Sequence, residues 1–218
     1  MIYKIKEHKN KLIERTYIEA MKEFNSFFGF NWITGTPNIC VLKNRKEIDL
    51  ISDYKTERYI IGFAKGGTAY ILDNRKMEEE SEHKKYTEEE YSKKLIKHEI
   101  CHLFYQVVSK DNNDPKWLAE GVSIFLSGEM KFKKPITRFI NFIEFHQKSG
   151  GEVYTESGTA IKLLVENFGK KKLLKLISQS GKAKNKKDFA KLFKEIYNFD
   201  LNYKNFNNLL NSKNKLIK

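Results

Sequence analysis

The chain has 218 residues, and 41 Lys and Arg against 28 Asp and Glu give it a formal net charge of +13. This length suits one domain with an adequate core, which we expect to divide into an N-terminal lobe (1–110) and a C-terminal lobe (111–218). No apolar run reaches the roughly 18 residues of a transmembrane helix, and no hydrophobic signal segment follows Met1, so we expect a cytoplasmic protein without membrane contact. The only cysteines, Cys40 and Cys101, are too few for a disulfide scaffold.

The first part of the chain predicts one helix followed by a small sheet. Residues 10–28 space their apolar side chains at helical intervals, so we expect an amphipathic helix that covers the sheet. Three short runs rich in β-branched and aromatic residues, 38–42, 59–64 and 68–72, then predict strands, and Gly66-Gly67 is suited to the turn between the last two. We therefore expect a small, mostly antiparallel sheet before the next helix.

A metal-binding pattern lies in the helix that follows the sheet, in the run His98-Glu99-Ile100-Cys101-His102. Residues four positions apart on a helix differ by about 40° around its axis, so both imidazoles can bind one metal ion. Glu99 lies between them, where its carboxylate can act on a water molecule without being a ligand. This division of roles is typical of zinc hydrolases.

The periodicity of this helix predicts a core side and a cleft side. Counting about 100° per residue, the two histidines lie opposite an apolar stripe. The stripe consists of Ile96, Ile100, Leu103 and Val107. Tyr91, Tyr105 and Ser109 share the histidine face and are candidates for lining the cleft, although they could equally be surface residues. Cys101 lies off both faces, which favours a packing role.

Glu120 is the best candidate for a third metal ligand. A catalytic zinc ion needs three protein ligands and keeps its fourth position for water. The polar stretch 109–114 predicts a loop, after which Asp114 as N-cap and Pro115 as first residue would begin a second helix with Glu120 in its second turn. An antiparallel return of the chain would then direct Glu120 at His98 and His102.

The rest of the chain is predicted to be helical. Apolar periodicity predicts helices over 136–147, 157–167, 171–177, 187–197 and 203–210. The fold class is therefore α+β, with a small sheet on the metal-binding helix and an all-helical C-terminal part. The histidines His8, His83 and His146 are expected at the surface, although His146 could line the cleft.

The paired elements His98-Glu99-x-x-His102 and Trp117-x-x-Glu120-Gly121 resemble the gluzincin zinc metallopeptidases, in particular the zinc aminopeptidases and smaller peptidase-MA-like proteins. The resemblance implies a thermolysin-like architecture, one zinc ion held by His98, His102 and Glu120, and Glu99 as general base and later proton donor. The segment from Tyr154 to Gly169 is similar to the one that supplies a transition-state tyrosine, which implies that role for Tyr154. The resemblance also implies that an edge strand, expected at 67–72, binds an extended peptide.

One departure from that family concerns specificity. The aminopeptidases have a Gly-x-Met-Glu-Asn strand whose Glu binds the substrate amino terminus, and this chain has no such strand. The sequence therefore predicts a metallopeptidase acting on a peptide or protein, without a choice between endopeptidase and exopeptidase.

The Lys-rich C-terminal region leaves other functions open. Residues 170–218 contain 14 Lys against 3 acidic residues. We favour a solvated face, but clustered lysines could also bind nucleic acid or an acidic partner. The chain could then be a regulatory protease that cuts one cytosolic partner, or a metal-bearing binding protein with little or no catalysis.

Overall fold

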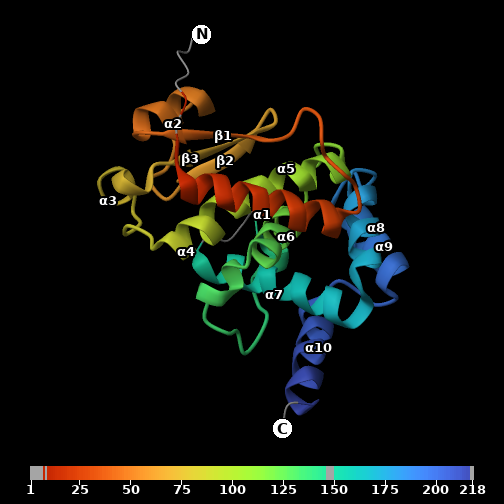
Figure 1. Cartoon of the computed structure of the whole chain (residues 1–218). Helices are drawn as coiled ribbons and strands as arrows, with labels where there is room; N and C mark the ends of the chain where they lie inside the picture. The colour runs from red at the N-terminus through yellow and green to blue at the C-terminus, as the bar shows by residue number, and fades with distance from the viewer. Residues whose placement is uncertain (1–6, 8, 146–149, 217–218) are drawn as a thin grey trace.

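The computed structural model describes residues 7, 9–145 and 150–216, and these form a mixed, helix-rich α/β fold with one small sheet. Figure 1 shows the sheet and α2 at one end of the molecule and α8, α9 and α10 at the other. The elements with their bounds are α1 (Lys11–Phe28), β1 (Asn38–Leu42), α2 (Arg45–Ser52), β2 (Gly62–Lys65), β3 (Thr68–Leu72), α3 (Met77–Glu80), α4 (Glu88–Glu90), α5 (Lys97–Ser109), α6 (Lys116–Ser127), α7 (Gly151–Phe168), α8 (Lys170–Ser180), α9 (Lys186–Tyr197) and α10 (Tyr203–Leu216).

The sheet has the strand order β1-β3-β2, so β3 lies in its centre. β2 and β3 form an antiparallel hairpin whose turn residues, Gly66 and Gly67, have φ values of 58° and 74°. Such positive φ values are what a tight two-residue hairpin turn needs, and glycine adopts them without strain. β1 pairs with β3 in parallel, so the expectation of a mostly antiparallel sheet is wrong for one of its two strand pairs. The expectation of 67–72 as an edge strand is also wrong, because β1 and β2 occupy the edges.

The predicted N-terminal helix is confirmed as α1. The Asn10 side chain accepts hydrogen bonds from the backbone N–H groups of Leu12 and Ile13, which begins the helix. Its buried face packs on α5, where the rings of Phe24 and Phe28 lie 5.5 and 5.7 Å from the ring of Phe104. The helix therefore packs mainly against α5, and the expectation that it covers the sheet is wrong.

A π-helical turn, Tyr91–Ile96, joins α4 to α5. A π-helical turn contains more residues than an α-helical turn, so the rotation of 100° per residue does not apply to residues before Lys97. The side chain of Tyr91 is buried, and its hydroxyl donates a hydrogen bond to the carbonyl of Leu72 at 2.8 Å. Tyr91 therefore fastens the helix to β3 and does not join the face of the two histidines.

The helix α5 is surrounded by other elements. α1, α6, α8, β2 and β3 all pack against it, so residues on every side of it are buried. Tyr105 and Ser109 are buried in this way, while Val107, expected in the core, is 49% exposed near the C-terminal end of the helix. Cys101 is fully buried, with its Sγ 3.9 Å from the Val122 carbonyl, which confirms its packing role.

Four of the predicted C-terminal helices are found, as α7, α8, α9 and α10, although α7 begins six residues earlier than predicted and α10 ends six residues later. The helix expected over 136–147 is wrong for its described part, which is a loop with one 3₁₀ turn at Phe142–Glu144, while 146 and 147 lie outside the described residues. Side chains replace helical hydrogen bonding here: Glu156 accepts hydrogen bonds from the N–H groups of Ile140, Asn141 and Phe142. Asn207 of α10 bonds both the N–H and the carbonyl of Phe139.

The short helix α2 was not predicted. Its eight residues are mostly polar or charged, and only Ile48 is buried. Asn44 caps its start, and Asp53, with φ 67°, ends it in the left-handed conformation. One buried apolar cluster runs from Ile13 to Leu210 and includes residues of both predicted lobes.

Candidate metal centre

Three side chains that the sequence predicts as metal ligands lie together between α5 and α6. The Nε2 atoms of His98 and His102 are 3.1 Å apart, and Oε2 of Glu120 lies 3.4 Å from the first and 3.7 Å from the second. A circle through these three atoms has a radius of about 2.0 Å, which is a typical zinc–nitrogen or zinc–oxygen distance. One ion can therefore contact all three donor atoms without any movement of the side chains.

The position of Glu120 follows from its two neighbours in the Trp117-x-x-Glu120-Gly121 run. Trp117 is buried with its ring edge-on to Phe142 at 5.1 Å, which fixes the first turn of α6. Gly121 lies against α7, where a Cβ atom would come within 2.6 Å of the Ser157 carbonyl oxygen. The helix begins at Lys116 after Pro115, one residue later than expected, and Glu120 occupies its second turn as predicted.

Glu129 is a member of the site that the sequence did not reveal. It lies in the 3₁₀ turn Glu129–Phe132 after α6, and its Oε2 is 2.9 Å from Nδ1 of His98. A carboxylate can only accept here, so Nδ1 of His98 carries the proton and its Nε2 is left to face Glu120 and His102. Lys133 holds the other oxygen of Glu129 at 2.7 Å. Carboxylates in this position orient metal-binding histidines.

The carboxylates of the cluster favour a positive charge between them and the two imidazoles. Burial alone would lower the pKa of His98, but hydrogen bonds to Glu120 and Glu129 raise it well above its ordinary value. Burial alone would raise the pKa of Glu120, but the two imidazoles lower it well below its usual range. The cluster therefore holds carboxylate oxygens and imidazole nitrogens around a point that favours positive charge, which either a proton or a metal ion can supply.

Glu99 is not among the three clustered donors, but its carboxyl group interacts electrostatically with all three of them. Its side chain is buried, burial raises the pKa of its carboxyl group, and its Oε2 has no hydrogen-bond partner among the described residues. The strand β2 passes directly over it: a Cβ atom on Gly62 would lie 2.9 Å from Oε1 of Glu99 and 2.6 Å from Leu95. A buried carboxyl group with one unpaired oxygen and a raised pKa is suited to exchange a proton.

Tyr154 lies in the first turn of α7, near the same carboxylates. Its ring packs edge-on against Phe145 at 5.0 Å. Burial raises the pKa of Tyr154, and the negative charges of Glu120, Glu129 and Glu99 raise it further. Its hydroxyl therefore stays protonated and can donate a hydrogen bond.

The remaining histidines do not join the cluster as far as the structure describes them. His83 is partly exposed, and its ring nitrogens contact the Tyr59 carbonyl at 3.0 Å and the Tyr86 hydroxyl at 3.2 Å. His8 and His146 lie outside the described residues.

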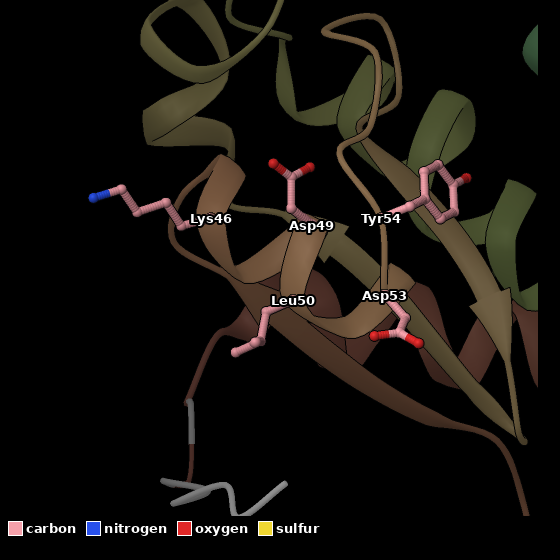
Figure 2. Close-up of a pocket in the computed structure, with 5 residues that line it drawn as sticks. All are labelled: Lys46, Asp49, Leu50, Asp53 and Tyr54. Atoms are coloured by element: carbon pink, nitrogen blue, oxygen red, sulfur yellow. The ribbon is translucent and has the colours of Figure 1, made fainter.

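A shallow depression on α2 is separate from this centre. Figure 2 shows the five side chains that line it, and they point in different directions instead of converging. The residues are Lys46, Asp49, Leu50, Asp53 and Tyr54. Asp49 is already engaged by the N–H and hydroxyl groups of Thr56, at 2.8 and 2.6 Å, so the depression offers no comparable ligand set.

Comparison of the chain with protein-family models, with curated proteins and with solved structures found no match. Within residues 7, 9–145 and 150–216, no helix is both long and apolar enough to cross a membrane.

Proposed function

We propose that the protein is a zinc-dependent peptidase with a thermolysin-like active site. The observation that carries this proposal is the convergence of His98, His102 and Glu120 on one point, with the buried carboxyl group of Glu99 beside it. Imidazole nitrogens and a carboxylate oxygen are donors that zinc prefers, and three protein ligands leave the fourth coordination position free for water. When bound, the zinc ion supplies a Lewis acid that activates water and polarises the peptide carbonyl.

The protein's own residues supply the proton transfers and the orientation. Glu99 takes a proton from the attacking water through its unpaired Oε2 and returns it to the amine that leaves. The protonated hydroxyl of Tyr154 donates a hydrogen bond to the oxyanion that develops on the carbonyl. Glu129 holds the His98 ring in the orientation and tautomer that present Nε2 to the centre.

The edge strand β2 is the part of the sheet best placed to bind a peptide. The N–H of Leu72 donates to the carbonyl of Ile61 at 2.8 Å, and the register of the hairpin then directs the backbone groups of Phe63 towards β3 as well. The backbone groups of Gly62 and Ala64 therefore point away from β3, at the free edge of the sheet, and β2 also packs against α5. A substrate added as a further strand would pass beside Glu99, which replaces our expectation for 67–72.

The test combines metal analysis with cleavage of a mixed peptide library, read by mass spectrometry with and without a zinc chelator. We expect about one zinc per chain and chelator-sensitive cleavage. Glu99→Gln should keep the zinc and lose about 10² to 10⁴ in rate, because it removes the proton acceptor but no ligand. Glu19→Gln, at an exposed position of α1, is the matched control and should keep full activity. A fully active Glu99→Gln protein would refute the mechanism.

The same experiment separates the peptidase from the alternative of a metal-bearing binding protein. Stoichiometric zinc without chelator-sensitive cleavage of any peptide would favour the binding protein. Absence of zinc, in contrast, would refute both functions.

A further inference from the structure

A lysine-rich surface lies on the helical hairpin formed by α8 and α9, away from the metal centre. We define the lysine face by six exposed residues, Lys171, Lys175, Lys182, Lys187, Lys191 and Lys194. Figure 1 shows α8 and α9 on the side of the molecule opposite the acidic elements α3 and α4. The net charge of +13 is thus unevenly distributed over the molecule.

Helix geometry directs these lysines outward from the core. On α8 the buried side chains centre on Leu173, Leu176 and Ile177, and Lys171 and Lys175 lie about 160° to 200° around the axis from Leu173. On α9, Lys187, Lys191 and Lys194 lie about 140° to 200° around the axis from the buried Phe189. The lysine face is therefore formed by the solvent sides of two helices that pack against each other and by Lys182 in the connection between them.

The arrangement of charge on these helices is unfavourable in the isolated protein. Lys171 and Lys175 are like-charged neighbours four residues apart, and so are Lys187 and Lys191, which opposes helix formation. Asp200 pairs with Lys194 at 2.9 Å, but residues 170–218 contain 3 acidic residues against 14 lysines. A polyanion laid on this face would relieve the repulsion and release condensed counterions.

The chemistry of the face selects among polyanions. On α8 and α9, no described residue is a large exposed apolar side chain, whereas binding in a membrane interface needs apolar side chains to insert. The same absence of exposed aromatic rings on the two helices, as far as described, disfavours single-stranded nucleic acid, which binds by base stacking. The region 170–218 contains no Arg, the side chain most often used to read bases.

We infer that the lysine face binds the phosphate backbone of double-stranded nucleic acid without reading its sequence. This inference is independent of the proposed peptidase activity, because none of its residues belongs to the metal centre. It assigns to the C-terminal helices a function that places the enzyme on a nucleic acid.

The test measures binding of the full-length protein to a labelled 25-base-pair DNA duplex of mixed sequence by fluorescence anisotropy, over a series of salt concentrations. We expect binding that weakens steeply with salt, in proportion to the number of phosphates neutralised. Replacing Lys171, Lys175, Lys187 and Lys191 by Gln should lower the affinity at least about 10-fold at 0.1 M salt. It should also reduce the slope of log K against log salt by about three to four.

A matched variant carries four Lys→Gln changes at exposed positions outside the lysine face. These positions are Lys11, Lys43, Lys46 and Lys55. Its net charge equals that of the first variant, so it should retain affinity within about 3-fold if the location of the lysines matters. Equal losses in the two variants would overturn the inference, as would failure to bind the duplex at 0.05 M salt. Tighter binding to single-stranded DNA, to polyglutamate or to anionic vesicles than to the duplex would overturn it too, and circular dichroism would verify that both variants fold.

Discussion

Replacing Glu129 by Gln tests whether the residue that the sequence did not reveal belongs to the metal centre. The change keeps the size of the side chain and an oxygen that can accept from Nδ1 of His98, but it removes the negative charge. The His98 and Glu129 side chains are each 11% exposed, so little solvent screens the interaction over its 2.9 Å. Lys133, 2.7 Å from the other oxygen, would lose its ionic partner as well.

The magnitude follows from this geometry. A buried hydrogen bond to a charged group contributes about 1.5–3 kcal/mol, and loss of a carboxylate behind a metal-binding histidine costs about 10- to 100-fold in metal affinity. We therefore expect Glu129→Gln to bind zinc about 10- to 100-fold more weakly, measured by competition with a chromophoric chelator at neutral pH. Glu152→Gln, an exposed change on the first turn of α7, removes the same charge and should leave the affinity within about 2-fold. An unchanged affinity in Glu129→Gln would refute the reasoning, provided that thermal unfolding shows a folded protein.

Three further substitutions test how the site is supported. Gly62→Ala brings a methyl group within 2.9 Å of Oε1 of Glu99, so under the proposed mechanism peptide cleavage should fall about 10- to 100-fold at unchanged zinc content. Gly121→Ala places a Cβ atom 2.6 Å from a backbone oxygen of α7, so it should lower the free energy of unfolding by about 1–3 kcal/mol in urea titration. Gly151→Ala is the control: its Cβ atom would meet open space, so the free energy of unfolding should stay equal or rise. Arg45→Lys removes a guanidinium that donates to three carbonyls of the loop before β2 and to the carbonyl of Glu80 at the end of α3, and we expect a loss of about 2–3 kcal/mol by the same measurement. An unfolding free energy within about 0.5 kcal/mol of the wild type would contradict the expectations for Gly121→Ala and Arg45→Lys.

The candidate metal-binding cluster could be predicted because its parts obey local rules. Residues four apart on a helix share a face, so His98 and His102 had to lie together wherever that helix packed. Glu120 needed only one further assumption, an antiparallel return after a short polar loop. The structure brings the three together within 3.1 to 3.7 Å.

What the sequence could not predict depends on contacts between distant segments. Glu129 reaches His98 only because α6 ends at Gly128 and the chain turns back, and no periodicity or motif marks that turn. The central place of β3 depends on a parallel pairing with β1, which a hairpin turn does not reveal. The described part of 136–147 has a helical pattern of apolar residues, but Glu156 and Asn207 satisfy its backbone groups in another conformation.

The two glycines of the site indicate what the second motif specifies. Gly121 allows α7 to approach the middle of α6, and Trp117 packs in the first turn of the same helix, so Glu120 lies between two residues whose positions are fixed by packing. Gly62 likewise allows β2 to approach α5 over Glu99. In both cases a candidate functional residue lies next to a glycine whose small size permits close contact, along the chain for Glu120 and in space for Glu99. The pattern Trp117-x-x-Glu120-Gly121 therefore specifies a packing arrangement as well as a candidate ligand. Glu120 can reach both imidazoles because Gly121 lets its helix pack closely against α7.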